Sequence, residues 1–371
     1  MKSTFTILLT TLLFSCTIAP TQQNDTIIIE PQSETLKLSD VFKSHELIVF
    51  KGILIGDIID FIETKDYYIL QTINETSDLL LFDKNGDYIQ PIVNKGRANN
   101  EALNIIDVNY CNKTNSLSVL ADYGMKIFEY SLDTKEITAT IKTPKSILVA
   151  KSAIKLDDDR FIYYKDLSYC DDQEYKLYVY NFKQDTIENQ FLPLNKATAE
   201  YVSFGQKNNL YEKDGEIHFY EAFDDNIYKV NKDSLSTHII FDKKELGISN
   251  EDLNRGYKGF DEFLNFCLDG GYIYAHTNCI QYQDKIFSWY RVGNQSYYNI
   301  ADIATQKSQS YTTINDDLIS NTTLKLGIYT PLSADKNGIY WSVDPTALRG
   351  IMQNPTALNE IGDNTIIIRF K

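Results

Sequence analysis

The sequence predicts an all-β fold, a six-bladed β-propeller, from three observations. Helical periodicity is nearly absent from the 371 residues, and short runs rich in Ile, Tyr, Phe and Val alternate with turn residues instead. A unit of polar turn, strand, gap, second strand and second polar turn recurs along the chain. A repeat of roughly 50 residues that holds about four short strands has the size of a propeller blade. Repeats in open β-solenoids are usually shorter, and a β-sandwich would not repeat one double hairpin.

The strand after the first turn shows the repeat most clearly. It begins at Tyr67, Leu117, Phe161, Ile217, Ile286 and Ile339, with offsets of 50, 44, 56, 69 and 53 residues. In the first five units a second strand follows 9 to 15 residues later, at Leu79, Lys126, Lys176, Asn226 and Ser296. Gly270 and Gly271 could also open the fifth unit, but only Ile286 leaves the second strand at the usual interval.

Ring closure requires one more strand. A propeller must close its ring or leave strand edges exposed. The sixth unit reaches the end of the chain at Ile366–Phe370 without a fourth strand, whereas the β-rich run Thr26–Glu30 precedes the first unit. We therefore expect this N-terminal strand to pair with the C-terminal strand and complete blade six.

The first residues indicate an exported lipoprotein. After Lys2, the apolar and Thr run Phe5–Phe14 has about half of the roughly 20 residues that a spanning helix needs. It ends in Leu-Phe-Ser-Cys16, which resembles the lipobox of bacterial lipoproteins and implies cleavage before Cys16 and its acylation. We expect a signal peptide at residues 1–15, a lipidated tether at 16–25 and the propeller at 26–371. An ordinary secretory signal is the alternative.

A family resemblance follows from several motifs. The TIIIEP strand, the run Leu36–Phe42, and Ile55–Ile58 followed by YYIL and LLLFDKNGDYI are similar to the N-terminal part of six-bladed propeller lipoproteins of gut Bacteroidetes. Asn94–Glu101 resembles their Gly-rich linker between blades one and two, without its usual Gly-Pro. The resemblance implies an NHL- or TolB-like propeller and an outer-membrane lipoprotein, with the periplasmic and surface faces both open. It implies little about activity.

Composition restricts the partners. The net charge is −15, and loss of residues 1–15 would leave −16, which disfavours nucleic acid and anionic membrane surfaces. The four remaining cysteines match no zinc pattern, and we expect free, buried thiols in strands, with one disulfide still open. They are Cys111, Cys170, Cys267 and Cys279. No cofactor, metal or catalytic motif is present in the sequence, and His45, His218, His238 and His276 are scattered.

Loop lengths predict where a ligand would bind. The tight turns before the first strands and after the second strands should share one face of the propeller. The longer links at 94–103, 165–175, 243–262 and 344–364 should gather on the other. Loops on a rigid scaffold often carry function. The candidate ligand-binding residues in or beside these links are Arg97, Tyr123, Lys165, Phe223, Arg255, Tyr257, Arg291 and Arg349.

Two functions remain. The favoured hypothesis is a non-enzymatic, monomeric module that binds a glycan, a peptide or an envelope protein. The alternative is a metal-dependent propeller hydrolase or lactonase, which needs hard oxygen ligands from several blades at the channel. The six first strands read YYIL, LSVL, FIYY, IHFY, IFSW and IYWS, without an acidic residue. Converging Asp, Glu or Asn side chains at the channel mouth would favour the hydrolase.

Overall fold

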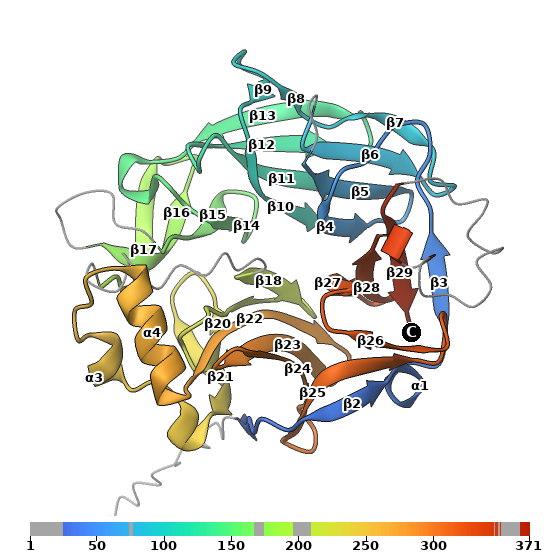
Figure 1. Ribbon diagram of the computed structural model, residues 1–371. Helices are drawn as coiled ribbons and strands as arrows, with labels where there is room; N and C mark the ends of the chain where they lie inside the picture. The colour runs from blue at the N-terminus through green and yellow to red at the C-terminus, as the bar shows by residue number, and fades with distance from the viewer. Residues whose placement is uncertain are drawn as a thin grey trace, which may run out of the picture.

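The computed structural model is a six-bladed β-propeller, which confirms the predicted fold class (Figure 1). It describes residues 25–73, 77–166, 174–195, 209–344, 346–347, 349 and 364–371. Six small sheets are arranged around one axis, each built mainly from four antiparallel strands. The predicted signal peptide, Cys16 and Cys170 lie outside the described residues.

Each blade runs outward from an innermost strand. Blade one contains β4 (Ile58–Glu63), β5 (Tyr67–Thr72), β6 (Leu79–Asp83) and β7 (Tyr88–Pro91). Blade two contains β10 (Ile105–Cys111), β11 (Ser116–Ala121), β12 (Lys126–Ser131) and β13 (Glu136–Lys142). Blade three contains β14 (Ser152–Lys155), β15 (Arg160–Tyr164), β16 (Tyr175–Asn181) and β17 (Thr186–Pro193). The short parallel pair β8 (Asn94–Lys95) and β9 (Glu101–Ala102) lies between blades one and two.

The other half of the ring repeats this order. Blade four contains β18 (Leu210–Lys213), β19 (Glu216–Phe219), β20 (Asn226–Val230) and β21 (Leu235–Asp242). Blade five contains β22 (Ile273–Tyr282), β23 (Lys285–Val292), β24 (Gln295–Asp302) and β25 (Lys307–Asp316), and β26 (Thr322–Lys325) pairs with β25. Blade six contains β27 (Tyr329–Asp335), β28 (Gly338–Val343) and β29 (Ile366–Phe370). The predicted first and second strands are thus the second and third strands of their blades, and the choice of Ile286 is confirmed.

The N-terminal segment closes the ring, but with a different strand from the one expected. β3 (His45–Ile48) pairs antiparallel with β29 and is the fourth strand of blade six. The expected strand instead becomes β1 (Asp25–Ile28), which adds in parallel to β21 of blade four. Ile27 and Ile29 are completely buried there, against a cluster that includes Phe241 and Tyr290. The run therefore pairs where an apolar cluster covers Ile27 and Ile29.

Between these strands the chain forms a belt along the outer rim (Figure 1). β2 (Glu34–Lys37) pairs in parallel with β25 of blade five, and the one-turn helix α1 (Leu38–Val41) leads to β3. Phe42 then packs its ring on Phe370 and on Trp341, with centroid distances of 4.7 and 5.7 Å. The belt therefore joins blades four, five and six from outside.

An insertion between blades four and five contains helices that the sequence pattern did not predict. After η2 (Lys244–Leu246), α3 (Asn250–Leu253) is capped by the Ser249 side chain, which accepts a hydrogen bond from the Asp252 N–H. α4 (Phe260–Gly270) buries Phe263 and Cys267. Cys267 is therefore in a helix and not in a strand. None of the helices described is long and apolar enough to cross a membrane.

Candidate ligand site at the channel mouth

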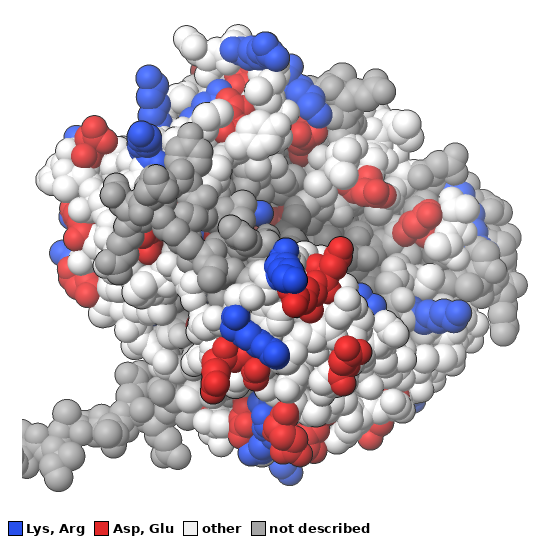
Figure 2. All heavy atoms as spheres, turned by 60° about the vertical axis from the view of Figure 1, so that its left-hand side comes forward, with Lys and Arg blue, Asp and Glu red and all other residues white. Residues whose placement is uncertain are grey.

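The two faces of the propeller differ as expected from antiparallel blades. The turns between first and second strands share a face with those between third and fourth strands, and this is the tight-turn face. The longer links are on the opposite, long-link face. Figure 2 shows acidic and basic side chains interspersed on one side of the ring, without an extended area of one sign. The net charge of −15 is therefore not concentrated on this side.

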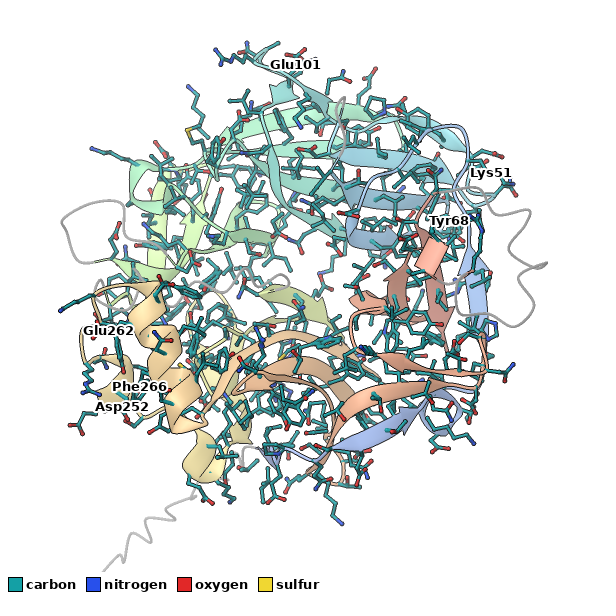
Figure 3. All side chains as sticks on the ribbon, viewed as in Figure 1. Lys51, Tyr68, Glu101, Asp252, Glu262 and Phe266 are labelled. Atoms are coloured by element: carbon teal, nitrogen blue, oxygen red, sulfur yellow. The ribbon has the colours of Figure 1, made fainter. Side chains whose placement is uncertain are left out.

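Three of the predicted ligand residues come together at the insertion, as part of a small apolar core. Phe223 and Tyr257 each pack on Phe263, at centroid distances of 5.3 and 5.2 Å. The Arg255 guanidinium lies 6.0 Å from the Phe266 ring. Figure 3 labels Phe266 on α4, at the edge of the ring. These contacts attach the insertion to blade four.

The other five predicted residues are distributed over separate parts of the ring. Lys165 is completely buried, and its Nζ lies 2.8 Å from Glu174 Oε1. Arg97 and Tyr123 are exposed near blade two, and Arg291 lies at the end of β23 in blade five. Arg349 is half-buried in the link between β28 and β29 of blade six. The eight residues therefore do not form one site, and their contact with a ligand stays a prediction.

A cavity of about 800 Å³ opens instead on the tight-turn face. Its wall consists of the ends of β4, β10, β18, β22 and β27 and the turns that follow them. Because these are the innermost strands, the cavity lies at the mouth of the central channel. Five of the six blades contribute to it, which is typical of a ligand site at a propeller axis.

Among the described residues that line the cavity, three polar atoms are buried and have no hydrogen-bond partner: the Tyr211 hydroxyl, Gln281 Oε1 and Arg369 Nε. Tyr211 is in β18 of blade four and Gln281 in β22 of blade five. The Tyr211 ring stacks on His218 with a centroid distance of 5.2 Å, which holds the phenol in place. Burial raises the pKa of Tyr211, so the hydroxyl remains a hydrogen-bond donor.

The backbone of β22 is bent where it approaches the cavity. Its pairing with β23 shifts register twice, between Tyr274 and Thr277 and again before Ile280. Ala275 and Asn278 adopt left-handed φ angles of 51° and 53°. Bulges of this kind redirect side chains and occur frequently beside binding sites. In β22 the bulges lie just before Cys279 and Gln281, which line the cavity. Burial raises the pKa of the Cys279 thiol.

The wall between blades one and six is an ionic network. Glu63 accepts hydrogen bonds from Lys84 at 2.5 Å, from the Tyr340 hydroxyl at 2.6 Å and from Arg369 at 2.6 Å. Burial alone would raise the pKa of Glu63, but the hydrogen bonds from Lys84 and Tyr340 outweigh burial and lower it. Glu63 is therefore ionised and fully engaged.

Three cysteines, Cys111, Cys267 and Cys279, are free thiols. Among the described residues, no group of three or more His, Cys, Asp or Glu side chains is placed to hold a metal ion. The sequence pattern did not indicate the cavity, because its residues come from short turns after innermost strands. The one available signal was the recurrence of Lys and Asp in those turns.

Comparison with known proteins identifies the family. The model of the family described as "Domain of unknown function (DUF4934)" matches residues 25–354. The chain belongs to this family. No curated protein sequence matches the DUF4934 chain.

Three solved structures align with the DUF4934 chain at low identity, and the first of them shares its fold. A candidate exported protein from Bacteroides fragilis aligns with a TM-score of 0.73 and 15% identity, over 94% of this chain and 100% of that one. An auxiliary nutrient binding protein from Bacteroides ovatus aligns with a TM-score of 0.46 and 10% identity, over 88% and 77% of the two chains. The extracellular domain of a candidate one-component system from Bacteroides thetaiotaomicron gives 0.39 and 12%, over 80% and 33%.

Proposed function

We propose that the DUF4934 chain is a binding module that holds a small polar ligand in the cavity at the tight-turn mouth of its channel. The observation that carries the proposal is the pair of buried, unpartnered atoms on adjacent blades, the Tyr211 hydroxyl and Gln281 Oε1. A buried polar atom without a partner costs about 1–3 kcal/mol. A ligand that donates to Gln281 and pairs with Tyr211 would recover that cost on binding.

The protonation states of the cavity support binding more than proton transfer. The pKa of Tyr211 and that of Cys279 are both raised by burial, which keeps these groups neutral near pH 7. Glu63 is ionised and accepts from three donors. General acid–base catalysis favours groups with a pKa near the working pH. Fixed donors and acceptors of this kind are suited to recognition.

The test is a calorimetric screen of neutral and charged sugars and of dipeptides against the full chain. We expect one class to bind, and Tyr211→Phe with Gln281→Ala to weaken binding at least about tenfold. The matched control is Tyr123→Phe, an exposed tyrosine on the long-link face, which should bind like the wild type. Absence of binding to the whole screen, or equal binding by the cavity variant, would contradict the proposal.

The location is a second part of the proposal, and the Leu-Phe-Ser-Cys16 motif supports it. We propose that Cys16 is acylated and anchors the propeller in the cell envelope as an NHL- or TolB-like lipoprotein. Replacement of Cys16 by Ser should abolish incorporation of labelled palmitate and move the protein out of the detergent phase. A Cys16→Ser protein that still incorporates palmitate would show that the anchor assignment is wrong.

A further inference from the structure

We propose that the ligand is a polyhydroxylated acid, such as an oligosaccharide that ends in a uronic acid, bound in one orientation. Its carboxylate lies against blades six and one, and its hydroxyl groups lie against blades four and five. This inference rests on the proposed function, because it concerns the same cavity. It follows from the unequal distribution of charge and of open hydrogen-bonding atoms around the mouth.

The cavity is less acidic than the rest of the molecule. Its lining contains five Lys or Arg residues and four Asp or Glu residues, in a chain whose net charge is −15. A concave surface of opposite sign to its surroundings concentrates ligands of the complementary charge. The lining therefore repels the anionic end of a ligand less than the rest of the protein surface does.

The free positive charge lies on the side of blades one and six. Lys65 and Lys336 are exposed in the turns after β4 and β27, and neither has a carboxylate within ion-pair distance among the described residues. The acid beside Lys336 is already engaged. Asp335 Oδ1 accepts from the backbone N–H of Asn337 at 2.7 Å and lies 2.8 Å from the Tyr340 hydroxyl.

Arg369 adds a donor to the same side. Its side chain is largely buried, and two of its nitrogens pair with Glu46 and Glu63. The third nitrogen, Nε, is buried without a partner on the wall of the cavity. Charge-assisted hydrogen bonds from a guanidinium to a carboxylate are among the strongest in proteins.

The side of the cavity mouth formed by blades four and five has exposed negative charge instead. Glu212 and Asp214 are exposed at the end of blade four, where they would repel a carboxylate. Tyr211 and Gln281 lie beside them with their open hydroxyl and amide oxygen. The hydroxyl groups of a sugar both donate and accept hydrogen bonds, so uncharged ligand groups can pair with the Tyr211 hydroxyl and with the Gln281 amide oxygen. The ammonium group of a dipeptide can only donate, whereas the open Tyr211 hydroxyl has a proton that needs an acceptor, and we therefore favour the sugar acid.

The experiment compares cellobiouronic acid with cellobiose, a neutral disaccharide of the same size, by calorimetry at low and high salt. We expect the acid to bind at least about tenfold more tightly at low salt, with the difference reduced by added salt. The double variant Lys65→Ala with Lys336→Ala should lose this preference, so that it binds the acid and cellobiose with similar affinity. The matched control, Glu212→Gln with Asp214→Asn, should keep or increase it.

The outcomes separate this inference from the proposed function. Equal binding of acid and neutral sugar, or a preference that survives loss of both lysines, overturns the anionic ligand and leaves a sugar-binding cavity. Binding of a dipeptide but of neither sugar overturns the sugar acid and leaves the binding module. If Tyr211→Phe with Gln281→Ala binds every ligand as the wild type does, the cavity itself is the wrong site.

Discussion

Arg369 and Glu63 are 306 residues apart in the sequence, and Nη1 of the arginine lies 2.6 Å from Oε2 of the glutamate. The pair joins the last strand of the chain to the innermost strand of blade one. The Tyr340 hydroxyl donates to the same carboxylate oxygen, and the Ser333 hydroxyl of β27 donates to the Phe61 carbonyl of β4, so three polar contacts fix blade six to blade one. The ring is therefore closed both by a strand and by a largely buried ionic network.

Replacement of Arg369 by Ala should destabilise the closed ring. It leaves Glu63 buried without its guanidinium, and loss of one partner of a buried ion pair costs about 3–5 kcal/mol. For this variant we expect the free energy of unfolding to decrease by about 2 kcal/mol, which is less than that range, because Lys84 still contacts Glu63. Urea denaturation measures it. The exposed pair of Lys183 with Asp159 is the control, and Lys183→Ala should change stability little.

A buried position in β29 can be compared with an exposed position in β1 by one substitution in each. Ile367 is fully buried and faces Ile48 of β3, whereas Ile28 of β1 is 39% exposed. Ile367→Ala should lower the free energy of unfolding by about 3 kcal/mol through cavity formation. Ile28→Ala should change it by less than about 0.5 kcal/mol. Equal effects of the two variants in thermal or urea unfolding would contradict closure through β29.

Gly86 is required by the close approach of blade one to the segment that follows β3. Its φ is +80°, and a Cβ there would lie 1.9 Å from the Val49 carbonyl oxygen. Gly215 has a similar φ of +83° with nothing within 4 Å of a Cβ. Gly215→Ala should therefore cost only about 1–2 kcal/mol for the left-handed backbone. Gly86→Ala should cost clearly more, and similar melting temperatures of the two variants would refute the contact.

Stability should fall on mild acidification because of His218. Burial lowers its pKa from 6.5 to about 4, so the unfolded chain binds a proton more readily than the folded chain. The stabilisation is complete above pH 6.5 and is lost as the pH falls towards 4. Between pH 7 and pH 5 we expect a loss of about 2 kcal/mol.

His218→Phe is the matched variant, because it keeps the ring between Tyr211 and His238 and cannot titrate. Urea unfolding over this pH range should show a weaker pH dependence in the variant than in the wild type. If the two proteins lose stability in parallel, other groups, such as the buried His276, account for the pH dependence.

The blade strands could be predicted because their signal is local. Short runs rich in Ile, Tyr, Phe and Val and their flanking turns are properties of adjacent residues, and they locate β5 and β23 without tertiary information. The 11-residue helix α4 was not predicted, although Phe263 and Cys267 are four residues apart and lie on one helix face. Its apolar positions, Phe263 and Cys267, are buried against the neighbouring Tyr274 and not in a repeated blade.

By itself the sequence determined the six-bladed propeller and the need for an N-terminal strand to complete blade six. Only the tertiary structure decided that β3 performs this role and that β1 joins blade four. Both segments can form strands, so the choice depends on which apolar cluster each one covers. The position of the cavity was likewise decided only by the tertiary structure. Tyr211 and Gln281 are 70 positions apart in the sequence, and the packing of blade five beside blade four brings them together at the channel.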